Sequence, residues 1–336
     1  MARPPLRKNL LRICFVALLS LAGYALTQYD VKEIYSRLKA SISAAQHSIV
    51  TDVGSESAPP TADRSDDTIH VASFNIQVFG LSKLKKKPVM DVLADVVRRF
   101  DVVAVQELRA KDQSVIPRFV ELINSDGSRY DYVVGPRLGR SSSKEQYVYL
   151  FDTSRIQIAR RGVYTIIDRQ DLLHREPLVA RFRVRGPPPE EAFTFTLVDI
   201  HTDPDETRTE LDALDDVVRT VRRNGGNEDD VILLGDLNVD EQHLGELGQM
   251  PNMKWVIEGE PTNTLGTKSY DNILFDNIST LEYTGRHGVL DLMSEYDLTM
   301  DEAIEISDHL PVWAEFRVRE GAAPQIAQQP GDTTSR

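Results

Sequence analysis

Five short segments of the chain end an apolar run with a carboxylate, carboxamide or imidazole side chain. They supply Asn75, Glu107, His201, Asp236 with Asn238, and Asp308 with His309. Free carboxylates are costly to bury inside a sheet, so several of them at strand ends indicate a shared opening onto solvent. Asp, Glu and Asn oxygens together with two histidines have the composition that metal-assisted cleavage of a phosphodiester requires.

Phosphodiester hydrolysis explains these residue types. The substrate is anionic, so an enzyme must neutralise charge, activate a water molecule and protonate the leaving oxygen. Oxygen ligands such as Glu107, Asn75 and Asp308 suit Mg²⁺, Mn²⁺ or Ca²⁺, and the chain has no thiolate set for zinc. Two further acids, Glu145 and Asp271, would give each histidine a carboxylate partner, which suits a general acid or base near neutral pH.

Hydrophobic patterning predicts the elements that position these residues. Apolar runs bounded by turn residues predict buried strands at residues 71–76, 102–105, 193–200 and 231–234. Helical spacing of apolar residues predicts amphipathic helices at residues 88–100 and 206–223. Strand–helix alternation of this kind is typical of a sheet covered by helices.

The order and local wording of the five segments resemble the deoxyribonuclease I branch of the endonuclease/exonuclease/phosphatase superfamily. The resemblance covers roughly residues 69 to 318 and includes residues 133–140 and 144–147, which look like the family's DNA-binding loop and following strand. Residues 175–177, 269–271 and 303–312 also match. The resemblance implies an α/β (α+β) fold, a four-layer α/β/β/α sandwich of two packed mixed sheets with the active site at one end.

The resemblance also implies roles for individual residues. The implied catalytic set is His201, His309, Glu145, Asp271, Asp236 and Asn238, and the implied metal set is Glu107, Asn75 and Asp308. Glu145 would support His201, and Asp271 would support His309, as two acid/base pairs flanking the phosphate. Asp236 and Asn238 would position the phosphate, the water or a second cation. The implied cofactor is Mg²⁺ or Mn²⁺, with Ca²⁺ as a further candidate.

Three arginines resemble DNA-contacting positions of the family. Arg109 resembles an arginine that enters the minor groove, and Arg140 and Arg175 resemble phosphate-contacting residues. The chain departs from the family at Ser143, where the family has a DNA-stacking tyrosine, and it lacks the cysteines of the family's disulfide loops. The family's calcium-loop acids are only partly recognisable, in Glu176, Glu260 and Thr262.

Each of these features also has a simpler interpretation. Asp236 and Asn238 could form an Asx-rich turn after a strand, and Arg109 could be a solvated partner of Glu107. The basic run at residues 83–87 is expected to be a solvated loop. His70, His243 and His287 match no motif and are expected to be structural or surface residues.

Two other function classes remain open alongside a DNA endonuclease. The same scaffold serves phospholipid headgroup and inositol-phosphate phosphoesterases, and a non-catalytic binding module is the third class. The net charge of −13 argues against extensive electrostatic wrapping of DNA, although a few arginines and a metal could still hold a short double-stranded stretch. No protein partner is predicted.

The two ends of the chain predict export and a linker. Basic residues followed by an apolar run predict that residues 1–26 are a signal peptide or an uncleaved signal anchor. Either form would place the catalytic domain outside the cytoplasm, where it would be secreted, periplasmic or attached to the membrane. Residues 27–68 are expected to form a helical stalk and flexible linker, and residues 319–336 a disordered tail. Residues 69–318 form the predicted catalytic domain.

Overall fold

The computed structural model describes residues 64–140, 144–226 and 228–321. The signal segment, nearly all of the stalk and linker, Ser143 and most of the tail therefore lie outside the described residues. Within the described ranges, no helix is long and apolar enough to cross a bilayer.

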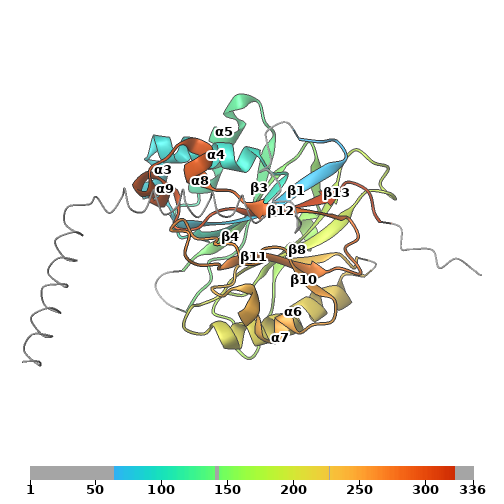
Figure 1. Ribbon diagram of the computed structural model, residues 1–336. Helices are drawn as coiled ribbons and strands as arrows, with labels where there is room; N and C mark the ends of the chain where they lie inside the picture. Colours follow the sequence, from blue (N-terminus) through green and yellow to red (C-terminus); the bar gives the residue numbers. More distant parts are fainter. Residues whose placement is uncertain (1–63, 141–143, 227, 322–336) are drawn as a thin grey trace, which may run out of the picture. The chain divides into compact units, whose positions relative to one another are not determined.

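Two mixed sheets form the centre of the domain (Figure 1). The first sheet contains, in spatial order, β12 (Tyr283–Val289), β13 (Val312–Arg317), β1 (Thr68–Phe79), β2 (Val102–Leu108), β4 (Gln146–Asp152) and β3 (Tyr130–Val134). The second contains β10 (Met253–Trp255), β11 (Asp271–Asp276), β9 (Val231–Asp236), β8 (Thr194–His201), β7 (Leu178–Val184) and β5 (Ile156–Ile158), with β6 (Tyr164–Thr165) paired to β7. The β1–β2 and β8–β9 pairs are parallel, and the other pairs are antiparallel.

Helices cover the outer face of each sheet (Figure 1). On the first sheet lie α3 (Leu81–Leu84), α4 (Lys87–Arg98), α5 (Val115–Ile123), α8 (Leu292–Tyr296) and α9 (Met300–Ile306). On the second lie α6 (Thr207–Asn224) and α7 (Gly245–Gly248), and short 3₁₀ turns occupy Asn124–Asp126, Arg160–Gly162 and Glu241–His243. This arrangement confirms the predicted four-layer α/β/β/α sandwich.

Strand alternation produces a core between the sheets and another beneath each helical layer. In β1, Ile69 and Val71 pack between the sheets, whereas Ala72 and Phe74 pack against the helices. Successive side chains of a strand point to opposite faces, so a strand covered on both sides must be apolar throughout. This is why the central strands appear in the sequence as unbroken apolar runs rather than as alternating ones.

The basic run at residues 83–87 corrects the expectation of a solvated loop. It is helical at both ends, because α3 ends at Leu84 and α4 starts at Lys87. Lys83 is buried and donates a hydrogen bond of 2.6 Å from Nζ to the carbonyl oxygen of Ile306. A lysine can be buried in this way because its aliphatic stem packs against apolar neighbours while its ammonium group reaches a carbonyl.

Candidate active site

Several central strands carry a site residue on the face that points between the sheets. Along β8, Phe195 and Leu197 belong to the inter-sheet core, and His201 has the same parity at the strand end. Along β9, Ile232 and Leu234 precede Asp236 in the same way. The same spacing relates Asn75 to Val71 on β1, Glu145 to Tyr147 and Tyr149 beside β4, and Asp271 to Ile273 and Phe275 on β11. The inter-sheet core therefore becomes polar at one end, and that end is the candidate site.

Two histidine–carboxylate pairs face each other across Asp236. His201 Nδ1 lies 2.7 Å from Glu145 Oε1, and His309 Nδ1 lies 2.9 Å from Asp271 Oδ2. The Nε2 atoms of both imidazoles lie 3.5 Å from the same oxygen, Oδ2 of Asp236. A carboxylate on Nδ1 fixes the orientation of each ring and favours its protonated form, which leaves both Nε2 atoms facing the carboxylate of Asp236.

The carboxylates set the charge of both histidines. Burial alone would lower the pKa of His309, but the carboxylates of Asp271 and Asp236 outweigh burial and raise it to about 10. The pKa of His201 is also raised, because Glu145 and Asp236 outweigh its burial. Conversely, His201 and Arg175 lower the pKa of Glu145 although that carboxyl is buried. The carboxylates therefore favour the protonated form of both imidazoles.

The turn after β9 holds Asp236 in position. Gly235 has φ +147°, and a β-carbon there would lie only 1.9 Å from the carbonyl oxygen of Ile200. Only glycine therefore allows β9 to run this close to the end of β8. Asp236 Oδ1 accepts a hydrogen bond from the backbone N–H of Asn238 (2.9 Å), and Asn238 Nδ2 donates to the carbonyl of Thr202 (2.9 Å). The first of these bonds forms an Asx turn, as the simpler interpretation of this segment expects.

The predicted metal residues converge on the C-terminal end of β1. The carboxylate of Glu107 accepts from the backbone N–H of Val78 (2.8 Å), and Asp308 Oδ2 accepts from the side chain of Gln77 (2.8 Å). Asn75 Nδ2 donates to Asp236 Oδ2 (2.9 Å), while Asn75 Oδ1 and Asp308 Oδ1 are buried oxygens without a hydrogen-bond partner. Unpartnered hard oxygens beside a carboxylate fit a divalent cation such as Mg²⁺ or Mn²⁺.

Backbone strain is concentrated at this point of the domain. Glu107 has φ 64°, Val78 has φ 49° and Asn238 has φ 53°, all in the left-handed region that non-glycine residues avoid. Each such residue costs about 1–3 kcal/mol, and such residues cluster at functional sites. The pairing register of β2 shifts on both sides near Glu107, and this irregularity turns its side chain toward the site.

The three predicted DNA-binding arginines occupy different environments. Arg109 lies at the site, with Nη2 3.0 Å from Glu107 Oε1 and about a third of its side chain exposed. Arg175 is buried instead, with Nε 3.0 Å from Glu145 Oε1. Arg140 is exposed and contacts Asp171 and Glu206, away from the histidine pairs. Of the three, only Arg109 combines exposure with a place next to the candidate metal residues.

Several supporting residues were not predicted in these roles. Thr262, which the sequence assigned to a calcium loop, donates from Oγ1 to Asp271 Oδ2 (2.7 Å). Tyr147 accepts at its hydroxyl from the backbone N–H of His201 (2.9 Å). Ser307 Oγ donates to the carbonyl of Asn75 (2.7 Å). Ser307 and Tyr147 lie within segments that the sequence already singled out, at residues 303–312 and 144–147. The role of Thr262 has no signal in the sequence.

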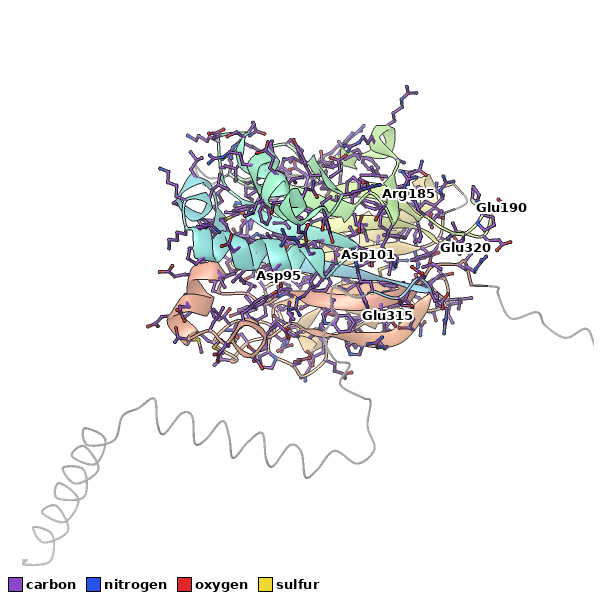
Figure 2. All side chains as sticks on the ribbon, turned by 90° about the horizontal axis from the view of Figure 1, so that it is seen from above. Asp95, Asp101, Arg185, Glu190, Glu315 and Glu320 are labelled. Atoms are coloured by element: carbon purple, nitrogen blue, oxygen red, sulfur yellow. The ribbon has the colours of Figure 1, made fainter. Side chains whose placement is uncertain are left out.

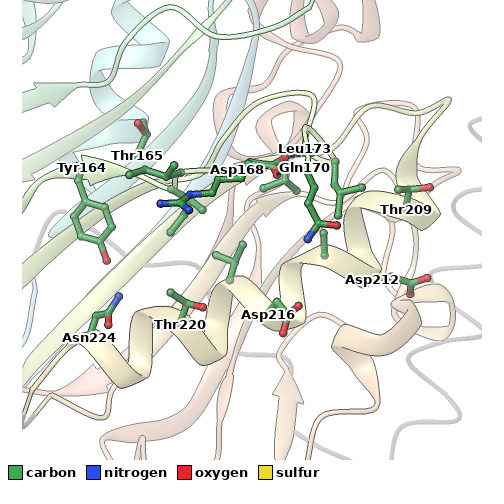
Figure 3. Close-up of a pocket in the computed structure, with 16 residues that line it drawn as sticks. Tyr164, Thr165, Asp168, Gln170, Leu173, Thr209, Asp212, Asp216, Thr220 and Asn224 are labelled. Carbon is green, nitrogen blue, oxygen red and sulfur yellow. Dashed lines mark hydrogen bonds between the residues drawn. The ribbon is translucent and has the colours of Figure 1, made fainter.

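Among the cavities that the described residues form outside the histidine pairs, two bear on the position of the site. One, of about 800 Å³, lies between the 164–173 segment and α6, and its wall includes Asp168, Asp212 and Asp216 (Figure 3). An acidic wall is unsuited to a nucleic acid. The other, of about 500 Å³, is lined by Asn238, Lys268 and Tyr270 and therefore borders the site directly.

Comparison with known proteins agrees with this geometry. The model of the endonuclease/exonuclease/phosphatase family matches residues 72–309. Deoxyribonuclease gamma of Rattus norvegicus is 31% identical over 276 residues, covering 76% of this chain and 86% of that protein. Deoxyribonuclease-1-like 1 of Cricetulus griseus is 34% identical over 262 residues, covering 74% of this chain and 84% of that protein.

Solved structures show the same fold. An endonuclease/exonuclease/phosphatase family protein from Bacteroides thetaiotaomicron superposes with a TM-score of 0.53 at 17% identity, covering 77% of this chain and 99% of that one. The chain belongs to the endonuclease/exonuclease/phosphatase family, and its relatives place it in the deoxyribonuclease I-like branch. This membership confirms the prediction that the chain is an enzyme that hydrolyses phosphodiester bonds.

Proposed function

We propose that this protein is an exported, divalent-metal-dependent endonuclease that hydrolyses DNA. The observation that carries the proposal is the pair of imidazole Nε2 atoms, both 3.5 Å from one oxygen of Asp236. The printed names of the relatives, deoxyribonuclease gamma and deoxyribonuclease-1-like 1, support DNA as the substrate.

The two histidine pairs would carry the protons of the reaction. A phosphodiester between the rings would place its anionic oxygens where both imidazoles already face the carboxylate of Asp236. One imidazole, in its neutral form, takes a proton at Nε2 from the attacking water, and the other, in its protonated form, gives a proton from Nε2 to the leaving oxygen. Glu145 and Asp271 hold the rings by Nδ1, so that only Nε2 is free for proton transfer. Asp236 and Asn238 orient the water and the phosphate.

Glu107, Asn75 and Asp308 would hold the divalent cation, Mg²⁺ or Mn²⁺, with Ca²⁺ as a further candidate. The bound cation would neutralise charge on the phosphate and orient it. The unpartnered oxygens of Asn75 and Asp308 support this assignment. Arg109, beside Glu107 and partly exposed, is the arginine best placed to reach the DNA.

The closing experiment uses purified protein and three substrates. Supercoiled plasmid DNA should be nicked in Mg²⁺ or Mn²⁺, and the activity should disappear in EDTA. Sphingomyelin and an inositol phosphate, assayed in parallel, test the lipid-headgroup and inositol-phosphate alternatives. Cleavage that persists in EDTA, or turnover of the lipid or inositol substrate alone, would overturn the proposal.

Export has its own measurement. The predicted signal segment, residues 1–26, is the feature that supports export, whether as a cleaved peptide or as an anchor. Sequencing the N-terminus of the protein recovered from outside the cytoplasm distinguishes these two forms. Protein found only in the cytoplasm with an intact N-terminus would contradict both.

A further inference from the structure

Three carboxylates converge at the end of the sandwich opposite the candidate active site. Asp230 immediately precedes β9, Glu282 immediately precedes β12, and Glu320 follows β13. One oxygen from each of the three lies within 4.8 Å of the others. Asp236 ends the same strand that Asp230 begins, and a six-residue strand is about 20 Å long. This cluster is therefore separate from the histidine pairs.

The cluster contains buried oxygens that no described residue satisfies. Asp230 is 2% exposed, Glu282 is 1% exposed, and each has one carboxylate oxygen without a hydrogen-bond partner, Oδ1 and Oε2 respectively. Thr280 is 2% exposed, and its Oγ1 also lacks a hydrogen-bond partner. This hydroxyl nevertheless lies close enough to Asp230 to lower the pKa of that carboxyl. A buried oxygen without a partner is costly and indicates a group that completes it.

A buried acid at the same end of the domain shows how the fold satisfies a carboxylate with its own residues. Asp101 Oδ1 lies 2.9 Å from Arg64 Nη1 and 2.6 Å from Arg155 Nε. Within the described ranges, no arginine, lysine or histidine forms a salt bridge with Asp230 or Glu282. Figure 2 labels both Asp101 and Glu320, the latter at the rim of the domain near Glu190. The three acids are thus a concentration of negative charge without a built-in cation.

We propose that Asp230, Glu282 and Glu320, together with the hydroxyl of Thr280, bind one divalent cation of the Ca²⁺ type. Ca²⁺ accepts six to eight oxygen ligands at about 2.3–2.6 Å, so two of its ligand oxygens can be up to about 5 Å apart. The three oxygens of this cluster lie within that limit. Mg²⁺ requires about 2.0–2.1 Å and retains its water molecules, so it fits a buried set of carboxylates less well.

The remaining oxygens of the acids are already held in place by the backbone. Glu320 Oε1 accepts from the backbone N–H of Thr194 (2.8 Å), and the backbone N–H of Gly321 donates to Glu282 Oε1. Asp230 Oδ1 and Glu282 Oε2 remain without a hydrogen-bond partner and could bind the ion. Glu320 is exposed and provides the entry path. A bound ion would join the start of β9, the start of β12 and the segment after β13, and so would stabilise the domain rather than take part in catalysis.

Protons are the alternative way to neutralise the cluster. Burial, together with the charge of Glu282, raises the pKa of Asp230 to about 9. A shared proton would therefore also remove the repulsion. The two possibilities differ in one respect, because only a cation site makes the stability of the protein depend on Ca²⁺ through these residues.

The experiment titrates CaCl₂ into full-length, chelator-treated protein and follows binding by calorimetry and unfolding by Tm. In the wild type we expect Tm to rise by about 5–10 °C when Ca²⁺ reaches about 100-fold its Kd. Asp230→Asn and Glu282→Gln should each weaken this binding event at least about 10-fold and remove one bound ion per chain, measured by elemental analysis after dialysis. Both variants should fold, because they remove like-charge repulsion, and their Ca²⁺-free Tm should equal or exceed that of the wild type.

Glu190→Gln is the matched control. It removes one negative charge at the same rim of the domain, but Glu190 is exposed and outside the cluster, so binding and Tm should follow the wild type. Two results would overturn the proposal: a wild type whose Tm does not respond to Ca²⁺, which would leave protons as the neutralising species, or a Ca²⁺ stoichiometry and Tm rise that are the same in the wild type, Asp230→Asn and Glu282→Gln. Neither result depends on the DNA-cleaving activity, so this test is independent of the proposed function.

Discussion

His201 and His309 occupy equivalent positions on either side of Asp236, and this symmetry governs the predictions for single residues. Replacing either histidine by alanine removes one proton carrier and leaves its carboxylate partner in place. We expect kcat for plasmid nicking to fall about 10²–10⁴-fold for His201→Ala and for His309→Ala, the range typical of a general acid or base. Circular dichroism should show an unchanged fold.

The control for these two variants is His243→Ala. His243 is exposed and contacts Asp240 in the turn before α7, so its removal should leave kcat within about twofold of the wild type. A His201 or His309 variant that behaves like this control would remove that histidine from the mechanism.

Arg109 and Arg175 both contact carboxylates of the site but differ in exposure. Comparing their alanine variants can therefore distinguish a residue that binds DNA from one that positions a catalytic side chain. Arg109 is a third exposed, so Arg109→Ala should lower kcat/KM for DNA strongly while sparing a small chromogenic phosphodiester that has no groove. Arg175 is buried against Glu145, so Arg175→Ala should lower kcat/KM on both substrates by a similar factor, because it acts through the Glu145–His201 pair. The ratio of kcat/KM on the two substrates is the measurement.

Equal losses on both substrates for Arg109→Ala would mean that Arg109 supports Glu107 rather than DNA. Arg175→Lys provides the control for the second variant, because it retains charge and length but has one donor group in place of the guanidinium fork. Partial rescue by lysine would support an electrostatic effect on Glu145, and a DNA-selective loss in Arg175→Ala would restore the predicted phosphate contact.

At the scale of elements, the close approach of β8 and β9 depends on one glycine. Gly235→Ala would place a β-carbon 1.9 Å from a backbone oxygen of β8, and backbone cannot move away as a side chain can. We expect the free energy of unfolding to fall by more than about 3 kcal/mol, measured by urea denaturation. Gly259→Ala separates this clash from backbone strain, because Gly259 also has a positive φ (67°) but a β-carbon there meets nothing within 4 Å. That variant should lose only about 1–2 kcal/mol, and equal losses would contradict the clash.

Much of the element order followed from the sequence because buried strands form unbroken apolar runs and amphipathic helices have a clear period. The strand predicted at residues 193–200 is β8, at residues 194–201, and the helix predicted at 206–223 is α6, at residues 207–224. Strand parity also explains why the site residues beside or on β1, β4, β8, β9 and β11 meet, since each lies an even number of positions from an inter-sheet core residue. Glu107 on β2 does not follow this parity and reaches the site through the register shift of its strand.

What the sequence did not reveal depends on contacts between distant segments. Lys83 looked like one more charge in a basic run, because its carbonyl partner, Ile306, lies more than 200 positions away. Arg175 carries the motif of an exposed phosphate contact but is buried against Glu145. Thr262 is fixed to Asp271 by a hydrogen bond that no local pattern announces. Burial and pairing of this kind are properties of the packed fold and cannot be deduced from spacing alone.

For the whole molecule, the net charge is −13 and buried acids are concentrated at two places. The way in which these acids are neutralised should therefore control how stability depends on pH. The candidate active site balances its acids with histidines and arginines, whereas the cluster at Asp230 has no such partner among the described residues. Changes in pH should therefore act on the two ends of the sandwich in different ways. The contribution of the active-site groups to the pH dependence of stability can be measured separately. The measurement is made in EDTA and compares proteins that share every other titrating group.

The Asp271–His309 pair yields the last prediction, on stability against pH. The pKa of His309 is raised from 6.5 to about 10 in the folded protein, so the native state holds this proton more tightly than the unfolded chain. The resulting stabilisation is fully present below pH 6.5 and is lost as pH rises through about 10. The reference is the double variant Asp271→Asn, His309→Gln, which removes both members of the pair and leaves no unpaired buried charge. In EDTA, the excess free energy of unfolding of the wild type over this variant should shrink by up to a few kcal/mol between pH 6 and pH 10.5.

Lys83, whose pKa burial lowers to about 8, would change stability in the opposite direction, but it is present in both proteins and cancels. A difference that stays constant over this range would show that His309 is not held as an imidazolium by Asp271, and the assignment of this pair to proton transfer would lose its electrostatic basis.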